Sequence, residues 1–316
     1  MFGILPLVII GIIIYVVVNN SNREDRRHES GIGGAISTRR LFQYALLLVA
    51  LGVAASGITG LLSRVISGAD VRRGTELAGP LASTVIGVPF FWMLALWVQK
   101  QHRTDPNERH SFAWSFYLNA ALIGSVVTAG STAFAFLNGF IDGDGYDGTV
   151  VAPFLVATGV WAAHWLVWRR VPPSTMADLH VMVASGVGLG AMAGGAAFII
   201  GSLVDRTLAD AGGVAVDRML SDPVWSAVTA IGIGGTIWVW HWLLNGLNSS
   251  RTTIWQGYVI LVGVLGGLLA AVIGGAIALF QLLQWFFGDP GASSAALHFR
   301  DTGWAFGVAA IGIGVW

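Results

Sequence analysis

The distribution of charge along the chain limits its fold more than any other feature of the sequence. Nine stretches contain no Asp, Glu, Lys or Arg, and most of them approach or exceed the ~20 residues that a helix needs to cross a bilayer. They are 1–22, 41–63, 81–99, 110–141, 150–168, 179–204, 223–250, 252–288 and 302–316. Lipid offers the backbone no hydrogen-bond partner, and the stretches lack the alternation of barrel strands. The sequence therefore predicts an all-α, polytopic transmembrane bundle of about nine helices.

Composition excludes several other classes of protein. Hydrophobic residues make up 55% of the chain, against only 17 Lys+Arg and 17 Asp+Glu, which excludes both a water-soluble domain and a disordered chain. The absence of Cys excludes a disulfide framework, a thiolate metal site and a cysteine nucleophile. We find no phosphate loop, zinc-binding His pair or serine elbow. The chain is therefore predicted not to be an enzyme, to hold no metal and to bind no nucleic acid.

The flanks of the first apolar stretch predict an orientation. Residues 1–18 are followed, not preceded, by basic residues, namely Arg23, Arg26 and Arg27, which is typical of a retained anchor helix with its N-terminus outside. With the next loop in the cytoplasm, 11 of the 17 basic residues fall on the cytoplasmic side. This bias agrees with the positive-inside rule. We expect a multi-pass protein of the cell membrane, with membrane lipids as its immediate partners.

Repeated motifs predict the organisation of the remaining chain. Four helical hairpins follow the anchor, and tryptophan-rich clusters mark their inner ends at 92–97, 161–165 and 238–242. Near the end of the chain, Asp301-Thr302-Gly303-Trp304 echoes Asp222-Pro223-Val224-Trp225. These repeats predict an anchor and polar linker at 1–35, a first four-helix unit at 36–172 and a second at 173–316. The last apolar stretch is short for a span, so we expect that the native chain continues past Trp316.

The four-helix unit, with its aromatic or basic entry and tryptophan-rich inner end, resembles an uncharacterised prokaryotic family of multi-span membrane domains. This family is known only as a domain of unknown function, and the resemblance covers roughly residues 36 to 316 as two tandem copies. It implies a membrane bundle and brings no activity or functional residues with it.

Two histidines form the first candidate site. His164 and His241 occupy matching Trp-x-x-His-Trp contexts near the inner ends of equivalent helices. Two imidazoles at equal depth are what a bis-histidine haem requires. The competing interpretation is an aromatic belt, in which a His beside Trp bonds headgroups or loop carbonyls without a cofactor. His180, which opens its helix beside Asp178, is interpreted as a polar first turn at a helix N-terminus.

Glycines and amides predict helix packing. Gly186, Gly190 and Gly194 recur every four residues with Gly188 and Gly195 beside them, and Gly263 and Gly267 repeat the spacing. Small residues at this interval let helix backbones approach closely in lipid. Asn119, Asn138, Gln281 and Gln284 are expected to form hydrogen bonds between helices. Both features favour packing over the binding of a substrate.

No Asp, Glu, Lys or Arg lies deep in a predicted span, which argues against proton-coupled transport. The preferred interpretation is a scaffold or accessory subunit that packs against other membrane proteins or against itself. One alternative is a transporter or channel for a neutral or apolar solute, because hydroxyls and carbonyls can line a path without charge. The other is a haem-bearing electron carrier that uses His164 and His241.

Overall fold

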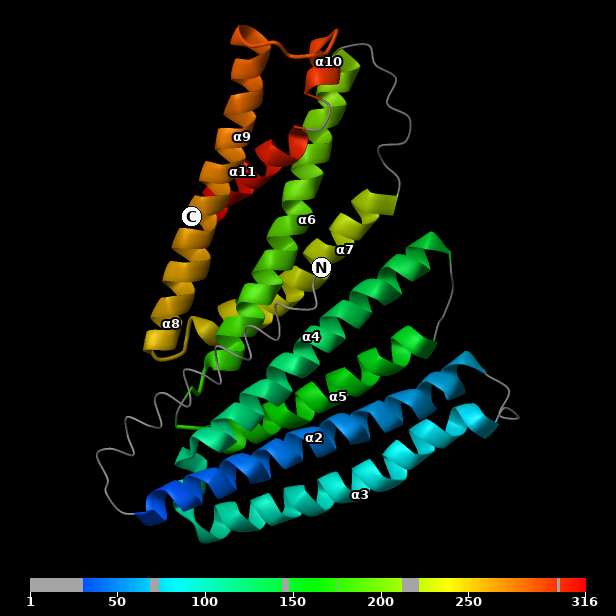
Figure 1. Ribbon diagram of the computed structural model, residues 1–316, viewed down its shortest axis with the longest axis vertical. Coiled ribbons are helices and arrows are strands. Elements are labelled where there is room, and N and C mark those ends of the chain that lie inside the picture. Colours follow the sequence, from blue (N-terminus) through cyan, green and yellow to red (C-terminus); the bar gives the residue numbers. More distant parts are fainter. Residues whose placement is uncertain (1–30, 69–73, 144–147, 175, 212–221, 300–301) are drawn as a thin grey trace.

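A computed structural model describes residues 31–68, 74–143, 148–174, 176–211, 222–299 and 302–316. Every regular element in these ranges is helical, which confirms the predicted all-α class (Figure 1). The elements are α2 (Gly31–Ser67), α3 (Gly74–Thr104), η1 (Pro106–His110), α4 (Phe112–Asp142), α5 (Gly148–Arg170), α6 (Leu179–Ala211), α7 (Asp222–Trp238), η2 (Val239–Gly246), α8 (Thr253–Tyr258), η3 (Val259–Gly266), α9 (Gly267–Phe287), α10 (Ala295–His298) and α11 (Gly303–Val315). The predicted anchor at 1–18 lies outside the described residues.

Seven helices of the described chain are long and apolar enough to cross a membrane. They run over Thr38–Ser67, Leu77–Thr104, Phe112–Asp142, Gly148–Arg170, Leu179–Asp210, Pro223–Gly246 and Thr253–Phe287. The last two are continuous helices that contain the wider π-helical turns η2 and η3. The eighth apolar helix, α11, is only ~20 Å long at 1.5 Å per residue.

Consecutive helices pack as hairpins, as the sequence predicts. α2 lies on α3, α4 on α5, α6 on α7 and α9 on α11. The hairpins then join through contacts of α2 with α4 and α5, of α4 with α6 and α7, and of α6 with α11. In Figure 1, α2 to α5 lie side by side as one group, while α6 and α9 run more upright in the other. α7 lies between these two groups.

Local sequence signals fix where the helices begin. The Ser111 hydroxyl accepts a hydrogen bond from the Trp114 N–H at 3.2 Å and starts α4, and Thr252 caps Trp255 in the same way at the start of α8. Such caps satisfy backbone donors that have no partner inside the helix. The aromatic residues that follow these two caps, Trp114 and Trp255 among them, lie at the same end of the bundle.

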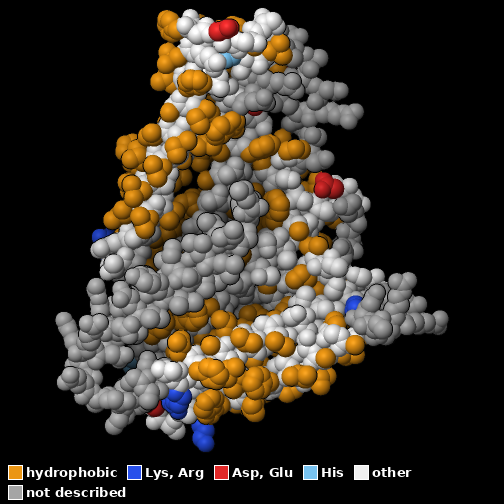
Figure 2. Space-filling view, in the orientation of Figure 1, with side chains coloured by type: hydrophobic (Ala, Val, Ile, Leu, Met, Phe, Trp, Pro, Cys, Tyr) orange, Lys and Arg blue, Asp and Glu red, His pale blue; other side chains and the backbone are white. Residues whose placement is uncertain are grey.

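The buried core gathers toward the end of the bundle where α4, α6 and α8 begin. Tyr44, Trp114, Tyr117, Trp165 and Met182 are among its members, drawn from α2, α4, α5 and α6. Outside this core, most large apolar side chains are exposed, and Figure 2 shows them covering the outer faces of α9 and of the α2–α3 hairpin. An exposed apolar surface of this extent fits a chain surrounded by hydrocarbon.

Candidate ligand-binding cavity

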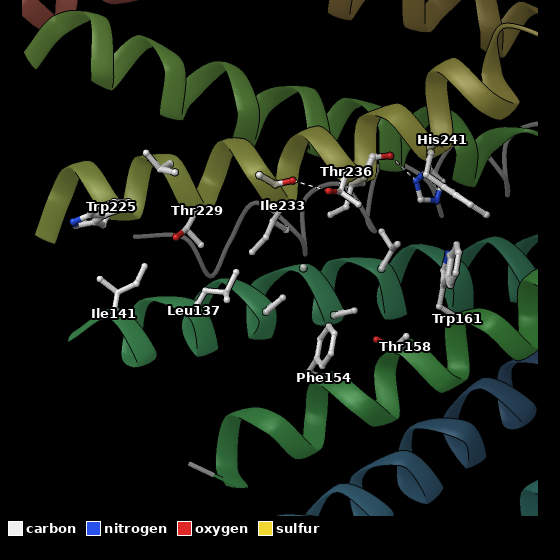
Figure 3. Close-up of a pocket in the computed structure, with 18 residues that line it drawn as sticks. Leu137, Ile141, Phe154, Thr158, Trp161, Trp225, Thr229, Ile233, Thr236 and His241 are labelled. Carbon is white, nitrogen blue, oxygen red and sulfur yellow. Dashed lines mark hydrogen bonds between the residues drawn. The ribbon is translucent and has the colours of Figure 1, made fainter. Parts of the chain in front are cut away.

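A cavity of about 820 Å³ lies between the α4–α5 hairpin and α7. α4 and α5 form one wall, and α7 with η2 forms the other (Figure 3). Between Trp225 near one end and His241 near the other, the wall of α7 and η2 is ~24 Å long. None of the described residues that line the cavity is an Asp, Glu, Lys or Arg. The cavity therefore suits an elongated, uncharged molecule.

Small side chains on the facing helices leave this space open. Ala129, Gly130 and Ala133 line it from α4, and Thr229 and Gly232 line it from α7. A Cβ atom added to Gly232 would meet nothing within 4 Å, whereas one on Gly130 would lie 3.0 Å from the Ile237 side chain. The two walls therefore approach each other near Gly130 and stand apart near Gly232. At the Trp225 end, the Ser226 hydroxyl donates a hydrogen bond to Asn138 Oδ1 at 2.7 Å and ties α7 to α4.

His241 lies at the aromatic end of the cavity. Its ring centroid is 6.1 Å from that of Trp161 and 5.9 Å from that of Trp165, and Trp240 meets Trp161 edge-on nearby. The side chain is only 2% exposed. Its Nδ1 lies 2.8 Å from the Ile237 carbonyl oxygen, and its Nε2 is buried without a hydrogen-bond partner among the described residues. His241 thus places a ring nitrogen without a described partner in a site whose lining is mostly apolar.

His164, the other sequence candidate, lies in a different environment. Its Nδ1 is 2.8 Å from the Val160 carbonyl oxygen and its Nε2 is 2.8 Å from the Tyr117 hydroxyl, so both ring nitrogens have partners. His164 is also absent from the described lining of the cavity, and no described ring contact or hydrogen bond joins it to His241. Haem ligation by this pair stays a prediction, and it would first require the bond between His164 and Tyr117 to break.

His180, which the sequence placed in the first turn of its helix, is buried. Its side chain is 1% exposed, and Asn119 Oδ1 accepts hydrogen bonds from its backbone N–H at 2.8 Å and its Nδ1 at 3.2 Å. Trp165 and Trp168 meet its ring edge-on. Asn119 was expected from the sequence to form a hydrogen bond between helices, and His180 is its partner. Asn138 forms another of the expected bonds, with Ser226.

Asp178, which precedes α6, is half-buried. Burial raises the pKa of its carboxyl group above the ordinary value of 3.8. A helix N-terminus favours a negative charge, but here removal from water has the larger effect.

Only some of the glycines predicted to pack lie close to a neighbouring helix. A Cβ on Gly267 would lie 2.6 Å from the Trp316 nitrogen, and one on Gly186 would make only ordinary contact with Tyr258. Gly190, Gly194 and Gly263 have nothing within 4 Å, because their helix faces point away from their neighbours in this chain. The close approach of α6 to α7 falls instead on glycines beside the predicted row. There, a Cβ on Gly188 would lie 2.6 Å from the Trp238 nitrogen, and one on Gly195 would lie 2.6 Å from the Ala227 oxygen.

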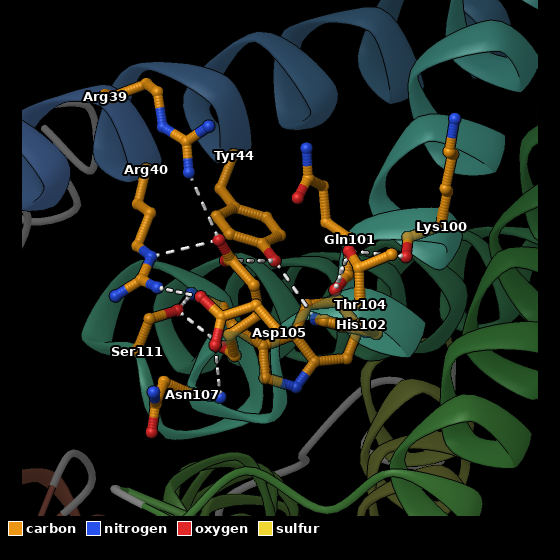
Figure 4. Close-up of polar contacts among 12 residues, drawn as sticks. Arg39, Arg40, Tyr44, Lys100, Gln101, His102, Thr104, Asp105, Asn107 and Ser111 are labelled. Atoms are coloured by element: carbon orange, nitrogen blue, oxygen red, sulfur yellow. Dashed lines mark hydrogen bonds and ion pairs between the residues drawn. The ribbon is translucent and has the colours of Figure 1, made fainter.

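A second polar cluster joins α2 to the connection between α3 and α4 (Figure 4). Glu108 is completely buried and accepts a hydrogen bond from Arg40 Nε at 3.0 Å, while the other end of the Arg40 guanidinium lies 2.8 Å from Asp105. The Tyr44 hydroxyl lies 3.1 Å from His102 Nε2 and 3.5 Å from Glu108. These bonds clamp three helices together. Because the buried acid is fully used by its partners, the cluster has a structural role and offers no free group to a ligand.

Comparison with known proteins identifies a family for the chain. No curated protein and no solved structure matches the chain. The model of one family, described as Domain of unknown function (DUF5671), matches residues 40–145 and 178–316. These segments make up most of the chain and confirm the resemblance to an uncharacterised family that the sequence motifs indicated. The chain belongs to this DUF5671 family.

Proposed function

We propose that this membrane protein binds a chain-like, uncharged solute of the bilayer in the cavity between α4–α5 and α7–η2. The observation that carries the proposal is the cavity itself, whose volume of about 820 Å³ lies within the ~300–1,000 Å³ typical of small-molecule sites. Its length covers most of the ~30 Å thickness of the hydrocarbon core. A solute with a long apolar tail would therefore lie within the protein at the depth that it occupies in lipid.

The chemistry of the walls favours an apolar tail over an ion. Besides His241, the described polar side chains that line the cavity are Thr158, Thr229 and Thr236, together with the indole groups of three tryptophans. Each of these side chains can lie beside an apolar ligand, and none carries the charge that ion sites in membranes use. This supports the second of the functions that the sequence leaves open, namely a carrier for a neutral or apolar solute.

The role as an accessory subunit is compatible with this proposal, since a ligand-binding subunit can belong to a larger complex. It remains a prediction that co-purification at fixed stoichiometry would test. The tandem repeat, the location in the cell membrane and the outward N-terminus also remain proposals. Their support is the repeated Trp-rich motif and the 11 basic residues that the predicted orientation places inside.

Filling the cavity tests the proposal directly. Gly232→Phe places a ring in the open space of α7, and Gly190→Phe is a matched control because that glycine is also open but lies outside the described cavity lining. A brominated long-chain alcohol should quench the tryptophan fluorescence of the full chain, since Trp161, Trp225 and Trp240 line the cavity. We expect Gly232→Phe to remove this quenching and Gly190→Phe to retain it.

Two results would overturn the proposal. The first is saturable quenching that is equal in both glycine variants, which would place the probe elsewhere on the protein. The second is a full chain that takes up no probe while a variant lacking residues 1–22 does so, which would assign the cavity to the chain's own N-terminal segment.

A further inference from the structure

We infer that the solute carries a neutral hydroxyl group, and that this hydroxyl donates a hydrogen bond to Nε2 of His241. The inference rests on the proposed function, because it names the head group of the molecule whose tail fills the cavity. It is carried by a separate observation, which is the hydrogen bonding of the His241 ring.

The tautomer of His241 follows from its contact with Ile237. A carbonyl oxygen can only accept, so Nδ1, which lies 2.8 Å from the Ile237 oxygen, carries a hydrogen. In a neutral imidazole the other nitrogen then has a lone pair and no hydrogen. Nε2 of His241 is therefore an acceptor. It is buried, it has no partner among the described residues, and it belongs to a residue that lines the cavity.

The chain itself shows which group satisfies such a nitrogen. His164 has the same contact between Nδ1 and the carbonyl oxygen four residues earlier, and its Nε2 accepts a hydrogen bond from the Tyr117 hydroxyl at 2.8 Å. Both histidines stand in Trp-x-x-His-Trp contexts. At His164 the protein supplies the hydroxyl donor, whereas at His241 no described residue does so. A ligand hydroxyl would complete the second site in the way that Tyr117 completes the first.

The position of His241 agrees with a head group. It lies roughly one and a half turns before Gly246, where its membrane span ends, while the cavity continues toward the far end of α7. The polar end of a membrane amphiphile lies near the interface and its tail points into the hydrocarbon. Figure 3 shows His241 and Trp161 facing each other across the cavity at this end. Its aromatic walls would hold a small neutral head out of water.

Other head groups fit less well. An ionised carboxylate or phosphate would direct lone pairs at the lone pair of Nε2, and no Lys or Arg lines the described cavity to neutralise it. An ammonium group could donate a hydrogen bond, but no carboxylate is among the described residues that line the cavity to balance its charge. An ether or ketone has no hydrogen to donate. Among simple head groups, a hydroxyl satisfies Nε2 without burying a charge.

Paired probes test this inference. A long-chain primary alcohol and its methyl ether share the same tail and differ in one donor hydrogen. Each would compete with the brominated alcohol for the full chain in detergent, with tryptophan fluorescence as the readout. Because the ether leaves the buried acceptor without a donor, we expect the alcohol to bind about tenfold more tightly than the ether. His241→Phe keeps a ring but removes the acceptor, and it should abolish the preference while tail binding persists. His164→Phe is the matched control and should retain the preference.

Four outcomes test this inference separately from the proposed function. If both probes bind with equal affinity to the unaltered chain, a resident water satisfies Nε2 and the inference fails while the proposed function stands. A preference for the alcohol that persists in His241→Phe assigns the head group to another residue and also overturns the inference. If neither probe binds, the proposed function itself fails. Loss of the preference only in His241→Phe supports both.

Discussion

At the scale of single residues, two histidines with the same local sequence have different roles because their neighbours differ. Tyr117 on α4 faces His164, and the hydroxyl–imidazole bond is buried between α4 and α5. His241 instead faces Trp161 and the cavity. The Trp-x-x-His-Trp pattern could locate both imidazoles near one end of the bundle. It could not reveal which one is satisfied, because the partner of His164 lies 47 residues earlier on another helix.

The bond between Tyr117 and His164 should contribute measurably to stability. Tyr117→Phe removes the donor and leaves Nε2 of His164 buried without a partner, which costs ~1–3 kcal/mol. Thermal unfolding in detergent should show the loss. In the double variant with His164→Phe, the two effects should be clearly less than additive, because both substitutions break one bond. Strict additivity would mean that the hydroxyl and the ring do not interact.

The Glu108 cluster predicts unequal effects of its two arginines. Arg40 is largely buried and bonds both Glu108 and Asp105, whereas Arg39 is half-exposed and reaches Glu108 only at 3.4 Å. Arg40→Gln leaves a buried carboxylate with little compensation, and we expect a loss of ~3 kcal/mol in the free energy of unfolding. Arg39→Gln should cost less than ~1 kcal/mol because water screens its charge. Equal losses measured by thermal unfolding would contradict this assignment.

Asp178 predicts a dependence of stability on pH. Burial raises the pKa of its carboxyl group in the folded protein above the ordinary value of 3.8, so the folded chain holds this proton more tightly than the unfolded chain does. The resulting stabilisation is complete below pH 3.8 and is lost as the pH rises through the folded pKa. Asp178→Asn cannot ionise. The difference between the thermal unfolding midpoints, variant minus unaltered chain, should therefore increase as the pH is raised from acidic to neutral. A constant difference across this range would refute the assignment.

At the scale of helices, the spans and their pairing into hairpins could be predicted, but the faces that pack could not. Uncharged length defines a span, and short loops make consecutive helices neighbours. Which face of a glycine-rich helix meets its partner depends on rotation about the helix axis. One residue changes that rotation by ~100°. The prediction therefore selected the row Gly186, Gly190 and Gly194, whereas α7 packs on the adjacent Gly188 and Gly195.

Alanine substitutions along α6 should distinguish these two faces. A Cβ on Gly188 would lie 2.6 Å from the Trp238 nitrogen and 2.7 Å from the Gly234 oxygen, so Gly188→Ala must push two backbones apart. We expect it to cost ~1–3 kcal/mol in stability. Gly190→Ala meets open space, and the higher helix propensity of Ala should make it neutral or slightly stabilising. Unfolding of both variants in detergent would measure the difference. Equal destabilisation would show that Gly190 also packs against another surface.

At the scale of the whole molecule, the cavity arises from the way in which hairpins meet. It lies between the second and third hairpins along the chain, whose contact joins α4 to α7. Apart from Asn138, which was expected to bond to another helix, no local pattern in the sequence points to that contact, since the cavity walls consist largely of apolar and small residues. The sequence could thus predict an uncharged solute as a candidate for binding or conduction. It could not predict where the cavity would be, because the space depends on how far two separately predicted hairpins stand apart.

The orientation of the whole bundle gives the final prediction. The connection between α3 and α4 should face the cytoplasm, and the end of α4 should face outward, because that arrangement places most basic residues inside. The chain contains no Cys, so single-cysteine variants report cleanly. Asn107 and Asp142 are both exposed and mark the two ends. In intact cells, a thiol reagent that does not cross membranes should label Asp142→Cys and leave Asn107→Cys unlabelled until the cells are opened. The reverse pattern would invert the bundle and place the His241 end of the cavity toward the outer face.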